Sequence, residues 1–299
     1  MDISCRSLSE LQTLPAAAMD MARLKSVESS SHPNSARPGR PPKFYAWEVA
    51  IVLALSLGRS AIYAVLNLAE RLTREPLGEQ SATVQSSQSR HEAFDFTYQL
   101  LDNLFALAPV ALVLYLFFLH GGNPFRRWGL DFRRLGRDWV LGVGLFVLIG
   151  AGTLVIYGIG RASGATVELI PADVGEHWWT TPMLLLTALR HSLLEEIIMV
   201  AYLFDRARRI WPALQVSTVR PPLSHRGLWV LVLVSAVLRG AYHLYQGFGP
   251  GVGNFLMGVI FGWLYLRYGR VMPLLIAHFL LDVVGFLAFP LLVAVVGIS

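Results

Sequence analysis

The stretch VMPLLIAHFLLDVVGFLAFPLLVAVV, residues 271–296, is apolar almost throughout and is long enough to cross a lipid bilayer as a helix. About 20 apolar residues span the hydrocarbon core at a rise of ~1.5 Å per residue. The stretch therefore predicts a membrane helix that begins near Val271. Its ionisable side chains are His278 and Asp282, which are four positions apart and so share one face of that helix.

The composition of the whole chain indicates several such helices. Of 299 residues, 54% are hydrophobic and only 15% are charged, whereas a soluble globular protein carries about 25% charged residues. We therefore predict an all-α, polytopic membrane protein of about seven spanning helices, with an eighth re-entrant or interfacial helix left open. The seven are expected to begin near Ala46, Tyr98, Asp138, Thr181, Leu228, Asn254 and Val271.

The charges of the loops predict an orientation in the membrane. The segment FRRWGLDFRRLGRD, residues 125–138, holds five arginines, whereas RASGATVELIPADVGEHWW, residues 161–179, is mostly acidic. Basic residues concentrate in cytoplasmic loops, so we expect a multi-pass protein of the inner or plasma membrane with a cytoplasmic N-terminus. This bias also explains the net charge of +5, and no nucleic-acid partner is expected beside the lipid bilayer.

We divide the chain into three regions. Residues 1–42 are rich in Ser, Pro and Arg, lack the apolar core of a cleavable signal and are expected to form a disordered basic arm on the cytoplasmic side. Residues 43–180 are expected to hold N-terminal helices that serve as scaffold and access, and residues 181–299 the catalytic bundle. The single cysteine, Cys5, excludes an internal disulfide and a cysteine-cluster metal site.

Five ionisable side chains late in the chain lie within predicted spans, where a charge costs at least about 2.5 kcal/mol. They are Glu195, Glu196, His243, His278 and Asp282, and they lie on three different predicted helices. If these helices converge, the side chains form one polar pocket. A carboxylate and a histidine beside one water molecule are a hydrolytic arrangement, with or without a metal. A proton-coupled transporter is the alternative, because transporters bury the same groups.

The expected depths of these residues do not agree well with a single pocket. At ~1.5 Å per residue, Glu195 lies roughly 17 Å from Arg206, the basic residue at the inner end of its helix. By the same count His278 lies roughly 12 Å from Arg270, at the inner end of its helix, and His243 lies roughly 25 Å from Arg226. A single site therefore requires that the fifth helix begins later than Leu228 or that the helices tilt.

The motifs around these residues resemble those of the CPBP intramembrane metalloproteases, the ABI or CAAX-protease-like superfamily that includes the type II CAAX prenyl endopeptidases. That family shows a Glu-Glu pair followed by three residues and Arg, then Phe-x-x-x-His, then His-x-x-x-Asn or Asp. Here the corresponding stretches are EEIIMV, RGAYH and HFLLD, which begin at Glu195, Arg239 and His278. The resemblance covers about a third of the chain, from about Thr181 to Gly285.

The resemblance implies an intramembrane endopeptidase that acts on a peptide or a membrane protein. It implies that Glu195 activates water with the help of His243, and that His278 and position 282 bind a metal or stabilise the oxyanion. An oxyanion needs donors, and Asp282 donates only when it is protonated. We therefore favour a metal, Zn²⁺, bound by Glu195, His243 and His278. Asp282 is a further possible ligand, and a metal-free glutamate mechanism is the alternative.

Two positions depart from the family pattern. Val200 stands where the family has Arg, and Arg239 stands where it has Phe. Arg239 shares a helix face with His243, so we hypothesise that it replaces the missing charge and holds Glu195 or Glu196 ionised. A structural contact of Arg239 with a carbonyl or a lipid head group is the alternative. The departures also leave open a catalytically inactive scaffold of the same fold.

Two further polar residues are candidates for supporting roles. Arg59 lies in the middle of the first predicted span and is expected either to pair with one of the glutamates or to extend along a cavity. His191 lies four positions before Glu195 on the same helix face and is expected to support the site. Nothing in the sequence specifies the substrate, a prenyl group or the oligomeric state.

Overall fold

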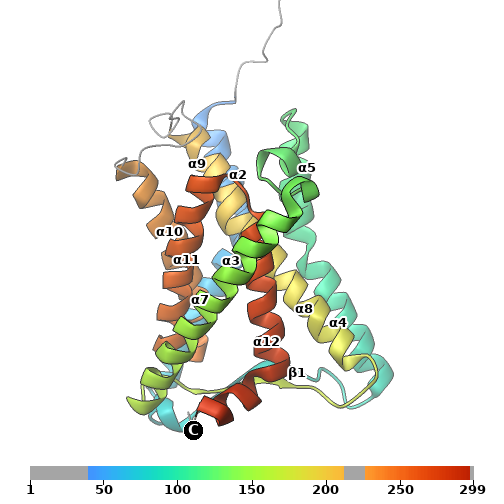
Figure 1. Ribbon diagram of the computed structural model, residues 1–299, viewed down its shortest axis with the longest axis vertical. Helices are drawn as coiled ribbons and strands as arrows, with labels where there is room; N and C mark the ends of the chain where they lie inside the picture. Colours follow the sequence, from blue (N-terminus) through green and yellow to red (C-terminus); the bar gives the residue numbers. More distant parts are fainter. Residues whose placement is uncertain (1–39, 212–225, 297–299) are drawn as a thin grey trace, which may run out of the picture. The chain divides into compact units, whose positions relative to one another are not determined.

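The computed structural model describes residues 40–211 and 226–296 of the chain. Within them, a helix begins within six residues of each of the seven expected starts. These helices are α2 (Pro42–Ala54), α4 (Glu92–Ala106), α7 (Leu135–Ala162), α8 (Thr180–Glu195), α10 (Arg226–Tyr242), α11 (Phe248–Tyr268) and α12 (Met272–Val296) (Figure 1). The basic arm expected at residues 1–42 lies, except for its last three residues, outside the described residues.

Shorter elements connect these helices. Two of them, η4 and α9, continue α8 without a break in the chain. The shorter helical elements are α3 (Leu57–Leu72), η2 (Leu77–Glu79), α5 (Ala108–Leu119), α6 (Pro124–Arg127), η3 (Phe132–Arg134), the π-helical η4 (Glu196–Tyr202), α9 (Leu203–Ile210) and η6 (Leu244–Gln246).

Four helical stretches among the described residues are long and apolar enough to cross a membrane. They are Glu92–Leu119, Pro124–Ala162, Phe248–Tyr268 and Met272–Phe289. A fifth is added if α2 and α3, which are bent by 51° at the break between them, form one span. The expected count of seven or eight is therefore not confirmed. α10 is short for a span, at 17 residues.

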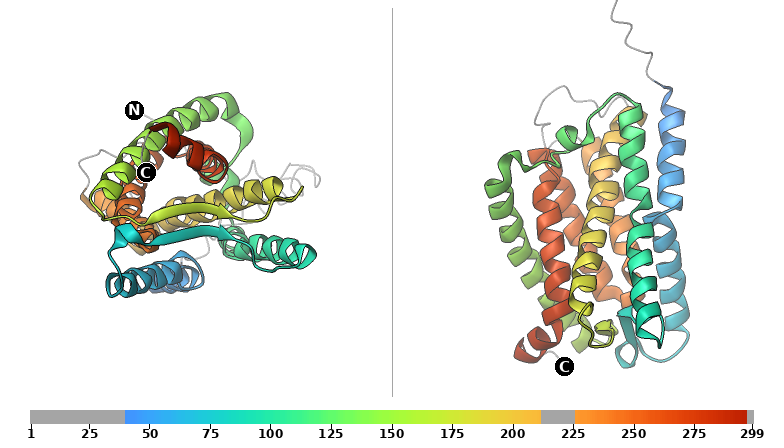
Figure 2. Two further views of the ribbon diagram at one scale, coloured as in Figure 1. Left: turned by 90° about the horizontal axis from the view of Figure 1, so that it is seen from below. Right: turned by 90° about the vertical axis from the view of Figure 1, so that its right-hand side faces the viewer.

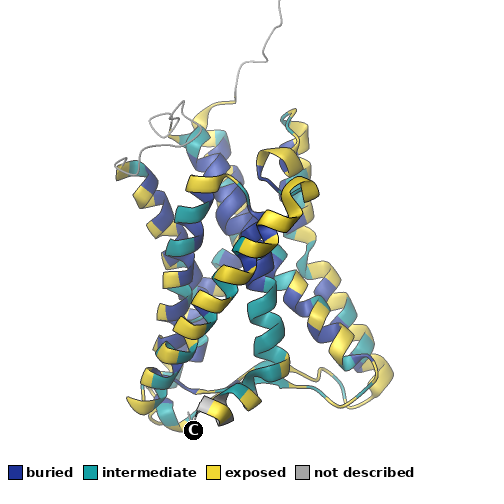
Figure 3. Cartoon of the chain, viewed as in Figure 1, coloured by how far each residue is buried: buried dark blue, intermediate teal, exposed yellow. Residues whose placement is uncertain are grey.

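The outward surface of the helices is apolar. In the stretch that includes α7, only 11% of the most apolar window is buried inside the protein, and Val147, Val155 and Ile159 are each at least 59% exposed. Figure 3 shows exposed residues along the outward face of this helix. A surface of this kind is unfavourable in water and favourable in lipid. The protein is thus an α-helical membrane protein, as the composition predicts.

Loops expected on the same side of the membrane lie at the same end of the helices. β1 (Ser81–Ser86) pairs in parallel with β2 (Glu168–Asp173), first residue to first residue, and joins the two loops expected outside (Figure 2). At the other end, Arg270 forms ion pairs with Asp131 at 3.0 Å and Asp138 at 2.6 Å and joins two loops expected inside. This grouping agrees with the alternation of loops; which end faces the cytoplasm stays a prediction.

Close packing of α10 against α11 builds the core beside the polar residues. A Cβ atom added to Gly258 would lie 2.8 Å from the Cα of Ala236, and one added to Gly262 would lie 3.2 Å from a methyl group of Val232. The absence of a side chain at Gly258 therefore permits this approach. α12 in turn packs on α7 and α8. The three helices that carry the polar side chains, α8, α10 and α12, thus surround one core.

Candidate functional site

The two adjacent glutamates lie where their helix changes type. α8 ends at Glu195, and the next seven residues form η4, a π-helical segment whose residues are all buried. Such segments are rare and occur frequently at functional sites. Adjacent side chains of an α-helix point about 100° apart, yet both glutamates contact α10. Glu195 bonds to Tyr242, and Glu196 bonds to Arg239.

Glu196 is a buried acceptor between two donors. Its Oε1 accepts hydrogen bonds from Arg239 Nη2 at 2.6 Å and from His278 Nδ1 at 2.7 Å. The side chains of Glu196 and Arg239 are fully buried, and that of His278 is 5% exposed. Because the two donors compensate the buried carboxylate, Glu196 links η4 to both α10 and α12. The contact also places Arg239 where the charge-replacement hypothesis requires it.

Glu195 keeps some exposed surface, whereas its neighbour keeps none. Its Oε2 accepts a hydrogen bond from the Tyr242 hydroxyl at 2.7 Å and lies 3.7 Å from Arg239 Nη1. One oxygen of Glu196, Oε2, is buried without a hydrogen-bond partner among the described residues. The side chain of Glu195 is 9% exposed and that of Glu196 is fully buried. Of the two glutamates, Glu195 is therefore the more accessible to a water molecule.

Two carboxylate oxygens lie near His278 Nε2. Since the Nδ1–H of His278 is donated to Glu196, a neutral His278 presents the lone pair of Nε2 to Glu195 Oε2 at 3.9 Å and to Asp282 Oδ1 at 3.7 Å. A nitrogen lone pair repels each of these oxygens unless positive charge lies between them. Both distances are longer than the about 3.4 Å between ligand atoms around a tetrahedral Zn²⁺, and Asp282 is not part of the group whose potential ligand atoms lie within 4.8 Å of one another. An imidazolium at His278 meets the same electrostatic need.

His243 lies at the margin of this cluster. Its Nδ1 donates to the carbonyl of Arg239 at 3.0 Å, which leaves the lone pair of Nε2 free for a metal or a water molecule. Glu195, Glu196 and His278 place potential ligand atoms within 4.8 Å of one another, and His243 is not part of that group.

The later start of the fifth helix, which would have equalised the depths, is not observed. α10 is already helical at Arg226, the first described residue after the gap, and it ends at Tyr242. His243 therefore lies just beyond the helix end. Between Glu195 and Arg206 the chain passes through the π-helical η4, so a count at the α-helical rise does not hold there. Between Arg226 and Tyr242 the chain is α-helical throughout, so the count for His243 stands.

The two residues expected in supporting roles have different positions. His191 Nδ1 lies 3.2 Å from Asp282 Oδ2, so His191 extends the cluster. Arg59 is exposed on α3, with its guanidinium over the ring of Tyr63 at 5.4 Å. Among the described residues no carboxylate forms an ion pair with Arg59, so the expected pairing with a glutamate is not found.

Tyr242 and Arg190 contact residues of the site, although they were not predicted from the sequence. Tyr242 lies three positions after Arg239, a spacing that places both on one helix face. That spacing was an available signal, but a tyrosine in an apolar helix is usually a packing residue. Arg190 donates to His191 Nε2 at 2.5 Å and to Asp102 on α4 at 2.9 Å. The contact with another helix is one that the sequence does not show.

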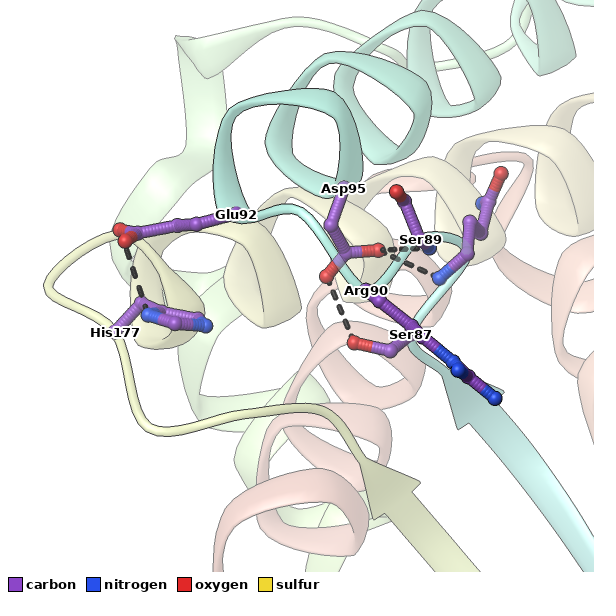
Figure 4. A pocket seen from close by; sticks show the side chains of 7 residues that line it. Ser87, Ser89, Arg90, Glu92, Asp95 and His177 are labelled. Atoms are coloured by element: carbon purple, nitrogen blue, oxygen red, sulfur yellow. Dashed lines mark hydrogen bonds and ion pairs between the residues drawn. The ribbon is translucent and has the colours of Figure 1, made fainter.

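A surface pocket lies near the starts of α4 and α8, in the loops expected outside (Figure 4). Asp95 accepts hydrogen bonds from the Ser87 hydroxyl and from two backbone N–H groups, and Glu92 faces His177 at 3.4 Å. These polar groups therefore bond to one another and order the loops. The pocket is lined by Ser87, Gln88, Ser89, Arg90, Glu92, Asp95 and His177.

Comparison with known proteins assigns a family to the part of the chain that holds the cluster. A family model described as Type II CAAX prenyl endopeptidase Rce1-like matches residues 177–284. The matched part, about a third of the chain, includes both glutamates, His243, His278 and Asp282. No curated protein and no solved structure shows a significant match. The resemblance expected from the three motifs is thereby confirmed for this domain.

Proposed function

We propose that this protein is an intramembrane endopeptidase of the CAAX-protease type, which hydrolyses peptide bonds in a polar site enclosed by its helices. The observation that carries the proposal is that His278 Nε2 lies 3.9 Å from Glu195 Oε2 and 3.7 Å from Asp282 Oδ1, and that Glu195 keeps 9% of its side chain exposed. The protease family matched by residues 177–284 supports this class of reaction.

In this mechanism Glu195 is the general base. Its Oε1 takes a proton from water as the water oxygen attacks the scissile carbonyl carbon, and it returns the proton to the leaving nitrogen when the C–N bond breaks. The hydroxyl of Tyr242 holds Oε2 and thereby fixes the direction of Oε1. In the metal-free alternative, His243 Nε2 accepts a hydrogen bond from the other O–H of the water and so helps to orient it. Arg239 pairs with the neighbouring Glu196 at 2.6 Å.

We also propose that the site holds Zn²⁺ through Glu195, His243 and His278, with Asp282 as a further donor. These side chains supply the nitrogen and oxygen atoms that Zn²⁺ accepts. When bound, the ion would polarise the scissile carbonyl and lower the pKa of its water. Each imidazole directs its Nδ1–H away from the site, as metal-binding histidines do. In the metal-free alternative, protonated His278 supplies the positive charge.

Replacing His278 by alanine is expected to abolish zinc binding. Metal analysis of the dialysed wild type should give about one equivalent of zinc per chain, and His278→Ala about a tenth of that or less, because a ligand is lost. His177→Ala is the matched control, since His177 lies in the surface pocket, and it should retain the metal. A wild type without zinc, or a His278→Ala variant that keeps it, would overturn the zinc site and favour the metal-free mechanism.

The function itself is tested with a defined peptide. The probe is a quenched fluorescent peptide ending in Cys-aliphatic-aliphatic-X, with or without a farnesyl group on its cysteine. Purified protein in liposomes should cleave the farnesylated peptide, which partitions into the bilayer, faster than its unmodified counterpart. If neither peptide is cleaved and the liposomes instead show a proton flux that requires Glu195, transport replaces proteolysis as the function.

We further propose that the N-terminus faces the cytoplasm of a cell whose inner or plasma membrane holds the protein. Cys5, the single cysteine, should react with an impermeant maleimide only after cells are made permeable. The Cys5→Ser, Gln88→Cys variant places the thiol in a loop expected outside and should react in intact cells. The opposite pattern, with Cys5 labelled in intact cells, would reverse the orientation inferred from the loop charges.

A further inference from the structure

A chain of hydrogen bonds leads from the surface of α4 to Asp282. Arg190 Nη1 donates to Asp102 Oδ2 at 2.9 Å, and its Nη2 lies 2.5 Å from His191 Nε2. The other ring nitrogen of His191, Nδ1, lies 3.2 Å from Asp282 Oδ2. The side chain of Arg190 is 11% exposed and that of Asp102 is 60% exposed. The chain of contacts therefore begins at the protein surface and ends in the site.

The chemistry of arginine fixes the direction of these bonds. A guanidinium only donates, so His191 Nε2 must be the acceptor of the bond from Arg190. The ring hydrogen of His191 then lies on Nδ1, from which it is donated to Asp282. One tautomer of neutral His191 is thus selected by its neighbour in the sequence.

The bond from His191 determines how Asp282 faces the site. It occupies Oδ2 and leaves Oδ1 directed at His278 Nε2, 3.7 Å away. A carboxylate held by one oxygen presents the other in a fixed direction, which is how supporting residues orient metal ligands and catalytic groups. His191 and Asp282 are 24% and 22% exposed, more than the buried Glu196 and His278. Without His191, Asp282 would be free to rotate towards solvent.

We propose that Arg190 and His191 are positioning residues of the active site: Arg190 fixes the tautomer of His191, and the Nδ1–H of His191 orients the carboxylate of Asp282. The inference rests on the proposed function, because it assigns Asp282 a task in catalysis. Asp102 anchors Arg190 from α4 and so couples a helix of the N-terminal region to the site.

Two amides at position 191 test the geometry. The side-chain nitrogen of asparagine lies near the place of the histidine Nδ1, and that of glutamine near the place of Nε2. His191→Asn should therefore retain kcat within about threefold, whereas His191→Gln and Arg190→Leu should lose about 10- to 100-fold, as is typical for such supporting contacts. KM should change little in all three variants. Equal activity of the asparagine and glutamine variants would overturn the proposal.

A spectroscopic measurement separates this inference from the proposed function. In histidine-labelled protein in bilayers, ¹⁵N spectra should show His191 protonated on Nδ1, and Arg190→Leu should shift the hydrogen towards Nε2. His191→Gln assigns the signal. If the wild type shows this tautomer but cleaves no peptide, the proposed function fails while the contact stands. If the wild type cleaves the peptide but His191 carries its hydrogen on Nε2, the positioning role fails.

Discussion

Replacing Glu195 by glutamine is expected to lower the rate of peptide cleavage by about 10²- to 10⁴-fold, the usual contribution of a general base. Glutamine has nearly the same size, and its amide oxygen still accepts the hydrogen bond from Tyr242. The amide nitrogen then occupies the position of Oε1 and cannot take up a proton, so the attacking water is no longer activated. The rate is measured as kcat on the farnesylated peptide in liposomes, and the fold is checked by the unfolding transition, which should be unchanged.

The same change at the next residue is the matched control. Glu196→Gln removes the nearer of the two carboxylates that pair with the fully buried Arg239, and breaking a buried ion pair costs up to roughly 3–5 kcal/mol of folding free energy. This variant should therefore unfold more easily, whereas Glu195→Gln should not. A Glu195→Gln variant that cleaves at the wild-type rate would remove Glu195 from the role of base, and one that loses proton flux instead would favour transport.

The positions of the helices could be predicted from the sequence because length and polarity decide them. A run of about 20 apolar residues has few alternatives to a helix in lipid, where every backbone polar group must be bonded within the segment. A charged side chain within the membrane also costs free energy. This cost identified the candidate residues Glu195, Glu196, His243, His278 and Asp282. Each of these residues lies in or beside the cluster, although their roles remain proposals.

The internal geometry of the cluster could not be predicted, because it depends on contacts between helices and on helix type. Nothing in EIIMVAY, residues 196–202, distinguishes a π-helical segment from an α-helix, and yet this segment directs two adjacent glutamates to α10. The bonds of Arg190 depend on the separation of α4 and α8. The pairing of β1 with β2 joins loops about 80 residues apart, beyond the reach of local patterns.

The free-energy cost of a charge within an apolar span identified Arg59 as unusual but did not show where its side chain lies. Its charge in the middle of an apolar run required a partner or a route to water. The structure places it just after the 51° break between α2 and α3, exposed and over the ring of Tyr63. The sequence predicted a span there but gave no sign of the break, and so could not locate Arg59 relative to the glutamates.

Moving the arginine from α10 to η4 tests whether Arg239 replaces the arginine that the family has at position 200. Arg239→Phe restores the family residue at that position and leaves the buried Glu196 without its cation, which should cost roughly 3–5 kcal/mol of folding free energy and most of the activity. Val200→Arg supplies the family arginine four positions after Glu196, on the same helix face. In the double variant, the introduced arginine should pair with Glu196 and recover much of both losses.

The double-mutant cycle gives the deciding number. Val200→Arg alone should destabilise the protein, because Val200 is 1% exposed and Glu196 already pairs with Arg239. If one arginine can replace the other, the two changes together should cost at least about 1 kcal/mol less than the sum of their separate effects. Arg239→Lys, which keeps the charge but not the planar fork, should fall between wild type and Arg239→Phe. If the double variant is no more stable and no more active than Arg239→Phe, an arginine at position 200 cannot take the place of the one at position 239. That result would show that Arg239 does not replace the family arginine.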